Sequence, residues 1–423
     1  MPELPPTNGL QLHWRDLLPA RGALGLDVAM RRQFGIDDLQ MTCSGTAALV
    51  IALRVLAARS SQRCEVVIPA YTCPLVARAV AHCGLQVRVC DLDVNGDGMD
   101  AAMLSSLCGA QTLAIVPTHL GGRIVDIAPA LKHARACGAY VIEDAAQALG
   151  GHHADGTPAG LAGDIGFCSL AAGKGLTIYE GGLLFARDAT LRALLRDAAA
   201  HALPRRIGWE LRRSAELIGY TALYRPRALA VAYGWPLRRA LRRGDFDAAA
   251  GDALPVTIPM HRVSAWRRNV AAHAMTRLPQ HLSAGAARAR VNIATLRAID
   301  GIAVMEDSAG AQGVWPVLMV RMPDQNTRDA ALAALWGAGL GVSVPFARAL
   351  PDYPSLRGIV PETNVPNARD HAARVLTITN SAWLNPAAFT QVADALADAV
   401  HDVARPKSVR PLLNPTAPPT TAH

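Results

Sequence analysis

From about residue 40 onward, short β-branched runs alternate with helical segments, and this rhythm limits the fold more than any other feature of the chain. Strands are expected at EVVIP (65–69), QVRVCDL (86–92), TLAIVP (112–117) and AYVIED (139–144). Helices are expected between them, at 46–58, 74–83 and 128–137. The strand runs are apolar on both faces, as a sheet covered on both sides requires. The pattern therefore predicts an α/β fold around a mostly parallel sheet.

The rest of the chain departs from this rhythm. A basic, aromatic stretch at about 205–256 is interrupted by Pro226 and Pro236, and later runs such as 314–322 and 374–384 predict a smaller α/β domain. We predict an organisation in four parts. These are an N-terminal arm (1–38), a large domain (39–260) that carries the insert, a helical connection with a small C-terminal domain (261–403), and a disordered tail (404–423).

Charge and cysteine content narrow the class of protein. The net charge is +8, and much of it lies in 205–243, but no zinc-finger, RNA-binding or basic-zipper pattern accompanies it, so nucleic acid is not an expected partner. An anionic substrate or a membrane surface fits the charge as well; for 205–243, a solvated helical hairpin over the active site is favoured over membrane contact. The eight cysteines, none in a C-x-x-C pair, indicate reduced thiols in a cytoplasmic protein and no metal site.

One lysine stands out in the segment SLAAGKGLTIYEGG (169–182). Of 42 basic residues only three are lysines, and Lys174 lies among apolar residues and glycines. Apolar surroundings lower the pKa of an amine from about 10.4, and only a primary amine forms an imine with an aldehyde, which arginine cannot do. The alternative is an ordinary surface lysine on a loop.

A second stretch, TCSGTAAL (42–49), has the chemistry of an anion site. Ser44, Gly45 and Thr46 stand where a short apolar run meets a helix, so free backbone N–H groups face any ligand there. Ser169, five residues before the lysine, can donate to the same anion. The alternative for Ser44 is a common helix cap.

Two more stretches follow expected strands. Asp144 ends one strand, with Gln147 one helical turn later, and its carboxylate can hold a cationic ring nitrogen or cap a helix. Tyr71 or Cys73, in PAYTCPL (69–75), can lie over a flat ligand or pack in the core. A phosphate site, a partner for a ring nitrogen and an amine for an aldehyde together describe one ligand, pyridoxal 5′-phosphate.

The same stretches resemble the DegT/StrS-type sugar aminotransferases, which are fold-type I pyridoxal-phosphate enzymes. The resemblance is dense over 40–190 and traceable over 260–400. It is carried by SGTAAL, VIPAYTCP, PTHLGGRIVD (117–126), VIEDAAQALG (141–150) and GDIGFCSLAAGKGLTIYEGG (163–182).

This resemblance implies roles for the site residues. Lys174 would bond covalently to the cofactor aldehyde and then carry a proton between substrate and cofactor, and Asp144 would pair with the ring nitrogen. Gln147 would lie near the ring, and Gly45, Thr46 and Ser169 would bind the phosphate. The family takes its amine from glutamate or glutamine, passes it to a keto sugar that is usually nucleotide-linked, and works as a homodimer. Relatives that dehydrate carry histidine in place of the lysine, so Lys174 indicates amine transfer for glycan or secondary-metabolite synthesis.

Three departures from the family pattern keep alternatives open. Cys73 replaces an aromatic residue, Tyr179 stands in the segment YEGG where the family has glycine, and Met260 replaces an asparagine that reaches the neighbouring subunit's phosphate. A regulatory pyridoxal-phosphate protein, or an aminotransferase for a cyclic ketone without a nucleotide, are therefore the other hypotheses.

Overall fold

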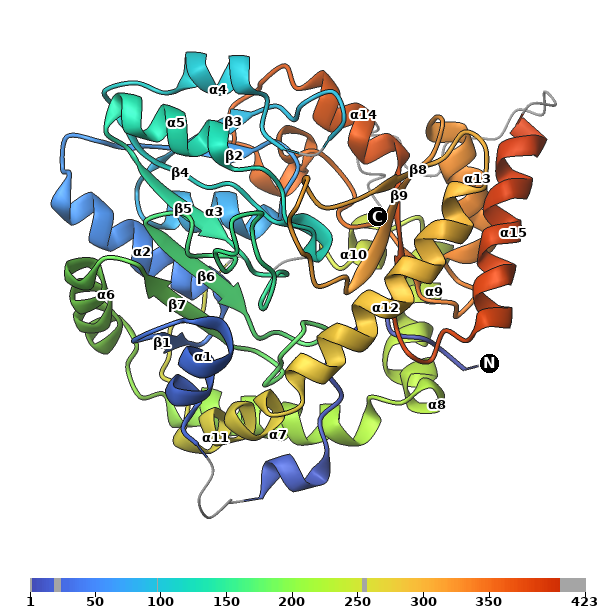
Figure 1. Cartoon of the computed structure of the whole chain (residues 1–423), viewed down its shortest axis with the longest axis horizontal. Coiled ribbons are helices and arrows are strands. Elements are labelled where there is room, and N and C mark those ends of the chain that lie inside the picture. The colour runs from blue at the N-terminus through green and yellow to red at the C-terminus, as the bar shows by residue number, and fades with distance from the viewer. Residues whose placement is uncertain (1, 19–23, 97, 253–256, 404–423) are drawn as a thin grey trace, which may run out of the picture.

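The computed structural model describes residues 2–18, 24–96, 98–252 and 257–403. It contains a seven-stranded sheet and a four-stranded sheet, each with its own helices (Figure 1). The tail predicted over 404–423 lies outside the described residues. The boundaries predicted between the four parts stay predictions.

The large sheet has the strand order β1-β7-β6-β5-β4-β2-β3. Its strands are β1 (Gln40–Thr42), β2 (Glu65–Pro69), β3 (Gln86–Cys90), β4 (Thr112–Ile115), β5 (Tyr140–Asp144), β6 (Ile165–Ser169) and β7 (Gly182–Ala186). Only β7 is antiparallel to its neighbours; the pairs among β2 to β6 are parallel. The predicted α/β class with a mostly parallel seven-stranded sheet is confirmed.

Helices cover both faces of this sheet. One side carries α2 (Gly45–Arg59), α3 (Pro74–His82) and α6 (Ala189–Ala202), and the other carries α4 (Ala101–Leu107) and α5 (Ala128–Cys137). Ten of the fifteen residues of α2 are buried, so this helix lies deep, as its apolar sequence predicts. Its first turn is therefore held firmly against the carboxyl ends of the strands.

The small sheet is antiparallel throughout, in the order β10-β11-β9-β8. Its strands are β8 (Ala303–Met305), β9 (Val317–Arg321), β10 (Val342–Ser343) and β11 (Val375–Thr379). The helices of this part of the chain are α12 (Leu278–Arg297), α13 (Gln325–Leu335), α14 (Pro366–Arg374) and α15 (Pro386–Val403). Together they confirm the smaller C-terminal α/β part that the sequence predicts.

The insert is helical. It consists of α7 (Ile207–Leu223), α8 (Pro226–Leu229), a π-helical turn (Ala230–Gly234), α9 (Trp235–Arg242) and α10 (Phe246–Ala250). Pro226 stands in the first turn of α8, where a missing N–H costs no helical bond, and Pro236 stands two residues after the π-helical turn that joins α8 to α9. The N-terminal arm joins the insert to the rest: Glu3 pairs with Arg238, and Leu4 donates its N–H to Gly339.

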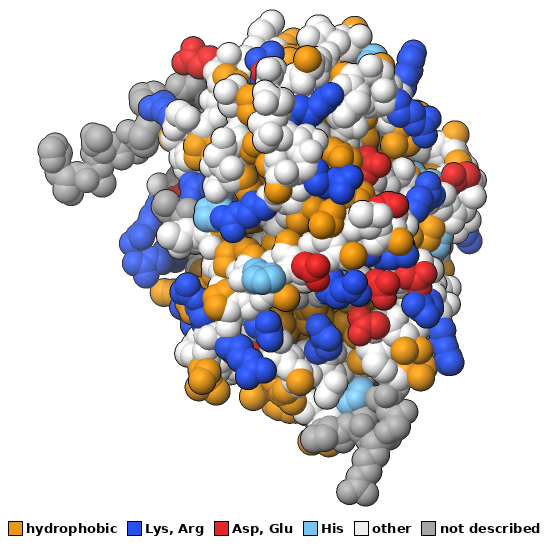
Figure 2. All heavy atoms as spheres, turned by 90° about the vertical axis from the view of Figure 1, so that its left-hand side faces the viewer, with side chains coloured by type: hydrophobic (Ala, Val, Ile, Leu, Met, Phe, Trp, Pro, Cys, Tyr) orange, Lys and Arg blue, Asp and Glu red, His pale blue; other side chains and the backbone are white. Residues whose placement is uncertain are grey.

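The remaining helices and the surface complete the fold. Near the N-terminus, α1 (Leu26–Phe34) packs on α11 (Ala265–Met275), which also contacts the 3-10 helix Trp14–Leu17. Among the described helices, none has the length and apolarity needed to cross a bilayer. On the face drawn in Figure 2, basic side chains are spread over the surface with apolar side chains between them.

Candidate active site

A cavity of about 530 Å³ opens where β5 and β6 end at Asp144 and Ser169. In open α/β sheets, ligands bind at this edge because loops and helix N-termini converge there. Eight of the nine residues that the sequence predicts for the site line this one cavity. They are Ser44, Gly45, Thr46, Cys73, Asp144, Gln147, Ser169 and Lys174.

One end of the cavity is the start of α2. Ser44 caps the helix, since its Oγ accepts from the N–H of Ala47 at 3.0 Å, so the capping alternative is correct for this residue. A Cβ on Gly45 would lie 3.3 Å from the Cβ of Ser169, tighter than an ordinary contact, so glycine lets α2 approach β6. The N–H groups of this turn, with the hydroxyls of Thr46 and Ser169 beside them in the cavity wall, suit a phosphate.

Asp144 lies at the centre of the cavity wall and is 3% exposed. Burial raises the pKa of its carboxyl to about 6, although the Ala146 N–H, 2.9 Å away, and the charges of His119 and Lys174 oppose this shift. A buried carboxylate with so little compensation favours a cationic partner. The ring nitrogen of a pyridinium is such a partner.

We expect the substitution Asp144→Asn to stabilise the cofactor-free protein at pH 8. Because the folded-state pKa is raised from 3.8 to about 6, the unfolded chain loses its proton first, and the carboxylate costs stability as pH rises through that window. A pKa shift of this size lowers the free energy of unfolding by roughly 3 kcal/mol once the Asp144 carboxyl is fully ionised. Urea unfolding of the wild type and Asp144→Asn at pH 4 and pH 8 measures this difference. The variant should be more stable than the wild type at pH 8 and equally stable at pH 4. The exposed Asp300→Asn is the control, and equal curves at both pH values would contradict the prediction.

Lys174 lies in the loop between β6 and β7, and its half-buried side chain separates two hollows. One is the cavity just described, and the other, of about 580 Å³, is lined by α9, α10 and the segment Ser343–Phe346. Burial lowers the pKa of the Lys174 amine, while Cys73 and Asp144 act in the opposite direction. A lowered pKa leaves more of the amine neutral and able to attack a carbonyl carbon.

Several contacts hold the lysine loop in place. The Thr7 hydroxyl donates to the carbonyl of Gly173 at 2.7 Å, and Gly173 itself has φ +80°, which favours glycine. The buried Arg267 donates to the carbonyl of Glu180 at 2.5 Å and forms a bidentate ion pair with Glu210 of α7. The loop is thus tied to the N-terminal arm, to α11 and to the insert.

Two further predicted residues flank the lysine. Gln147 accepts the Gly121 N–H at 2.8 Å through Oε1, which fixes its amide in the cavity wall. Cys73 borders both hollows, and burial raises the pKa of its thiol to about 12, so the thiol is neutral. A small neutral side chain therefore stands where the family pattern has an aromatic ring.

Tyr71 is the exception among the predicted residues. It is 2% exposed, its hydroxyl donates to the Phe346 carbonyl at 2.9 Å, and its ring packs edge-on against Phe346 and His371. It lines a separate hollow of about 30 Å³ and not the cavity around Lys174. This placement does not support the predicted stacking role; the core-packing alternative fits it, because a buried phenol needs a hydrogen-bond partner in the core.

The cavity also contains residues that sequence reasoning did not single out. Trp209, Arg212 and Arg213 of α7 also line it, with both guanidinium groups within 5.7 Å of the indole centroid. Their pattern, an aromatic residue followed by two arginines one turn on, was visible only as part of a basic stretch. Met260 is packed against the core and does not line the cavity, although its neighbours Ile258 and Pro259 do.

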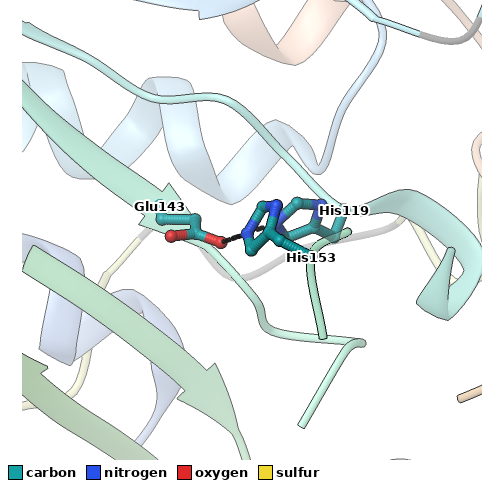
Figure 3. Close-up of side chains that lie close together, drawn as sticks. All are labelled: His119, Glu143 and His153. Atoms are coloured by element: carbon teal, nitrogen blue, oxygen red, sulfur yellow. Dashed lines mark hydrogen bonds and ion pairs between the residues drawn. The ribbon is translucent and has the colours of Figure 1, made fainter. Parts of the chain in front are cut away.

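A group of three residues at the cavity wall, His119, Glu143 and His153, has ligand atoms within 4.8 Å of one another (Figure 3); His119 itself lines the cavity. Glu143 faces both imidazoles, at 2.8 and 2.6 Å, and its other oxygen accepts the N–H groups of Ala162 and Gly163. Burial opposes ionisation, but the two histidine bonds outweigh it and hold the pKa of Glu143 below its ordinary value. Both oxygens of the Glu143 carboxylate therefore have nitrogen partners in the fold.

Comparison with known proteins agrees with this geometry. The model of the DegT/DnrJ/EryC1/StrS aminotransferase family matches residues 29–223. GDP-perosamine synthase of Caulobacter vibrioides is 37% identical over 153 residues, which are 36% of this chain and 40% of that protein. UDP-N-acetyl-3-dehydro-alpha-D-glucosamine 3-aminotransferase of Acidithiobacillus ferrooxidans is 35% identical over 159 residues, 37% and 42% of the two chains.

The likeness to solved structures extends over almost the whole chain. Spr1654 from Streptococcus pneumoniae, in its PLP form, superposes with a TM-score of 0.70 at 16% identity, covering 95% of this chain and 99% of that one. The matched part spans only about two fifths of the curated relatives' length. The fold is therefore that of this solved structure over almost the whole chain, whereas the sequence similarity is concentrated around the site.

Proposed function

Because the DegT/DnrJ/EryC1/StrS aminotransferase family model matches residues 29–223, we propose that the chain is a member of this family and a pyridoxal-phosphate-dependent aminotransferase. It moves an amino group from glutamate or glutamine to a keto sugar that is linked to a nucleotide. The observation that carries the proposal is one cavity that combines a primary amine, Lys174, with a buried carboxylate, Asp144, and the open first turn of α2.

The residues present fit the cofactor group by group. Gly45, Thr46 and Ser169 would hold the phosphate, Asp144 would pair with the ring nitrogen, and Gln147 would lie beside the ring. When bound, the cofactor supplies an aldehyde that takes up an amine and a ring that withdraws electrons from it. The neutral form of Lys174 would then carry the proton from the substrate carbon to the cofactor and back, because the lowered pKa keeps the amine available as a base.

The anionic parts of the substrates have cationic partners in the same cavity. Arg212 and Arg213 line it; both pair with Glu216, and Arg213 also pairs with Glu180, so a substrate anion would take the place of these carboxylates. Guanidinium groups bind carboxylates and phosphates with two parallel hydrogen bonds. The donor's carboxylate and the acceptor's diphosphate are both candidates for this position. UDP-linked and GDP-linked sugars occur in the names of two relatives, and this supports a nucleotide-linked acceptor.

The test is a pair of half-reactions followed by absorbance. The enzyme is loaded with pyridoxal phosphate and offered glutamate or glutamine, which should remove the visible absorbance of the bound aldehyde form. Keto sugars linked to UDP, GDP or dTDP, and a cyclic ketone without a nucleotide, are then offered in turn, and the nucleotide-linked acceptor should restore it. Bound cofactor that reacts with no donor would overturn the proposal in favour of a regulatory protein.

We also propose that the enzyme is a homodimer in the cytoplasm. All eight cysteines are free thiols, which suits a reducing compartment. Light scattering after size-exclusion chromatography gives the mass of the assembly, and a mass of one chain would contradict the homodimer.

A further inference from the structure

The outer face of α7 is apolar along its whole length. Exposed residues recur there at spacings of three and four, so they share roughly a quarter of the helix circumference. They are Ile207, Leu211, Ala215, Ile218 and Ala222, here called the α7 face. Ile207 is 75% exposed and Leu211 66%, whereas Leu217 and Thr221, which lie outside the stripe, are buried. Water-exposed isoleucine and leucine in a continuous stripe indicate a surface that something covers.

The concentration of such residues is local. The described part of the chain has twelve exposed large apolar side chains, and six of them lie between 207 and 235. Three of the six belong to the α7 face, and the other three are Leu223, Val231 and Trp235. The guanidinium carbon of Arg239 lies over the Trp235 ring, 5.5 Å from its centroid. Figure 1 shows α7 near the lower edge of the molecule, outside both sheets.

Arginines border the α7 face at both ends. Arg205 and Arg206 precede the helix, Arg225 and Arg227 follow it, and all four are exposed. Within the described residues none of the four forms an ion pair. The segment 205–243 contains ten arginines and two glutamates, a formal charge of +8 that equals the net charge of the whole chain. The rest of the protein is therefore electrically balanced, and the insert is strongly cationic.

We propose that the α7 face binds the surface of a membrane that contains anionic phospholipids. A helix that lies flat in the headgroup region has this construction: an apolar stripe that enters the acyl boundary, and arginines that reach the phosphates. At 17 residues α7 is about 25 Å long and lies on the membrane without spanning it.

Charge selects this partner over two others. A second copy that packed the same face against itself would bring two segments of charge +8 together, which repel each other. Nucleic acid would match the arginines but gives no reason for the stripe of isoleucine and leucine, since its contacts with protein are mainly polar. An anionic lipid surface satisfies both the charge and the apolar stripe.

The experiment is co-sedimentation of the full, cofactor-loaded chain with phosphatidylcholine vesicles, with and without phosphatidylglycerol. The wild type should bind vesicles that contain phosphatidylglycerol about tenfold or more tightly than vesicles of phosphatidylcholine alone. Binding to the phosphatidylglycerol vesicles should weaken as the salt concentration rises. The triple substitution I207S/L211S/I218S should lower the affinity about tenfold or more, because three apolar side chains leave the acyl boundary. R225Q/R227Q should do the same through charge.

Matched control variants distinguish binding through the α7 face from non-specific binding through other exposed apolar or basic residues. V94S/V291S removes two side chains that are 76% and 67% exposed on other elements, and R31Q/R32Q removes two exposed arginines of α1. Both should bind like the wild type. Cofactor absorbance and the urea midpoint of each variant show that it is folded, and because binding is read by sedimentation, failure of the aminotransferase proposal would leave this test intact.

Three results would overturn the proposal. The first is equal binding of wild type and I207S/L211S/I218S to the phosphatidylglycerol vesicles. The second is a fall in the mass of the assembly in the triple variant, which would assign the α7 face to a second copy. The third is retention on DNA, lost in R225Q/R227Q, without any vesicle binding.

Discussion

Replacing Lys174 by arginine is expected to abolish amine transfer, with a loss of roughly 10⁴-fold or more in kcat. Arginine keeps a positive charge and a long side chain, but its guanidinium neither condenses with an aldehyde nor gives up a proton near neutral pH. With the cofactor bound, the primary amine of Lys174 would hold its aldehyde covalently, which a guanidinium cannot do. Turnover with glutamate and a keto sugar measures the loss.

The control is Lys132→Arg, which makes the same chemical change on the exposed surface of α5 and should leave turnover unchanged. Borohydride reduction followed by peptide mapping gives a second measurement: the label should lie on the peptide that contains residue 174 in wild type and Lys132→Arg, and be absent from Lys174→Arg. Turnover in Lys174→Arg within tenfold of the wild type would contradict the assignment of this residue.

The central strands could be predicted because their burial leaves a simple trace in the sequence. EVVIP at 65–69 coincides with β2 and APALKHARAC at 128–137 with α5, since a strand covered on both faces must be apolar throughout and a surface helix must have one apolar side. Lys174 and Asp144 stood out for a related reason: each is an ionisable side chain in an apolar segment, where charge is costly unless it has a use.

The remaining parts of the site depend on distant pairings that no local pattern shows. Tyr71 follows a strand, as a residue that stacks on a ligand ring would. Its hydroxyl nevertheless donates a hydrogen bond to the carbonyl of Phe346, which is 275 positions away in the chain. Arg212 lies in an insert whose basic residues all look alike until the fold directs some into the cavity and others to the solvent. In each case tertiary contacts, and not the local sequence, decide the role.

The substitution Glu210→Ala is expected to destabilise the protein by about 3–5 kcal/mol, because it leaves the fully buried Arg267 without its anion. Arg267 donates to both carboxylate oxygens of Glu210 at 2.7 Å. Burial opposes ionisation of Glu210, but these bonds and those from Ser264 lower its pKa. The ion pair therefore contributes its full stabilisation above the ordinary pKa of a glutamate, and this stabilisation is lost as pH falls from there through the lowered pKa of Glu210.

A double substitution distinguishes a lost ion pair from a lost contact surface. In Glu210→Leu/Arg267→Met neither member of the pair is left as an unpaired buried charge, so we expect much of the stability to return, as replacing both members of a buried pair often allows. Yet the carbonyl of Glu180 also loses the Arg267 donor in this variant, so the lysine loop should hold the cofactor less tightly even where the fold recovers. Urea unfolding and cofactor titration of the wild type, both single variants and the double variant measure the two effects. A cost below about 1 kcal/mol for Glu210→Ala would show that Arg267 finds another partner, and that the insert does not hold the lysine loop.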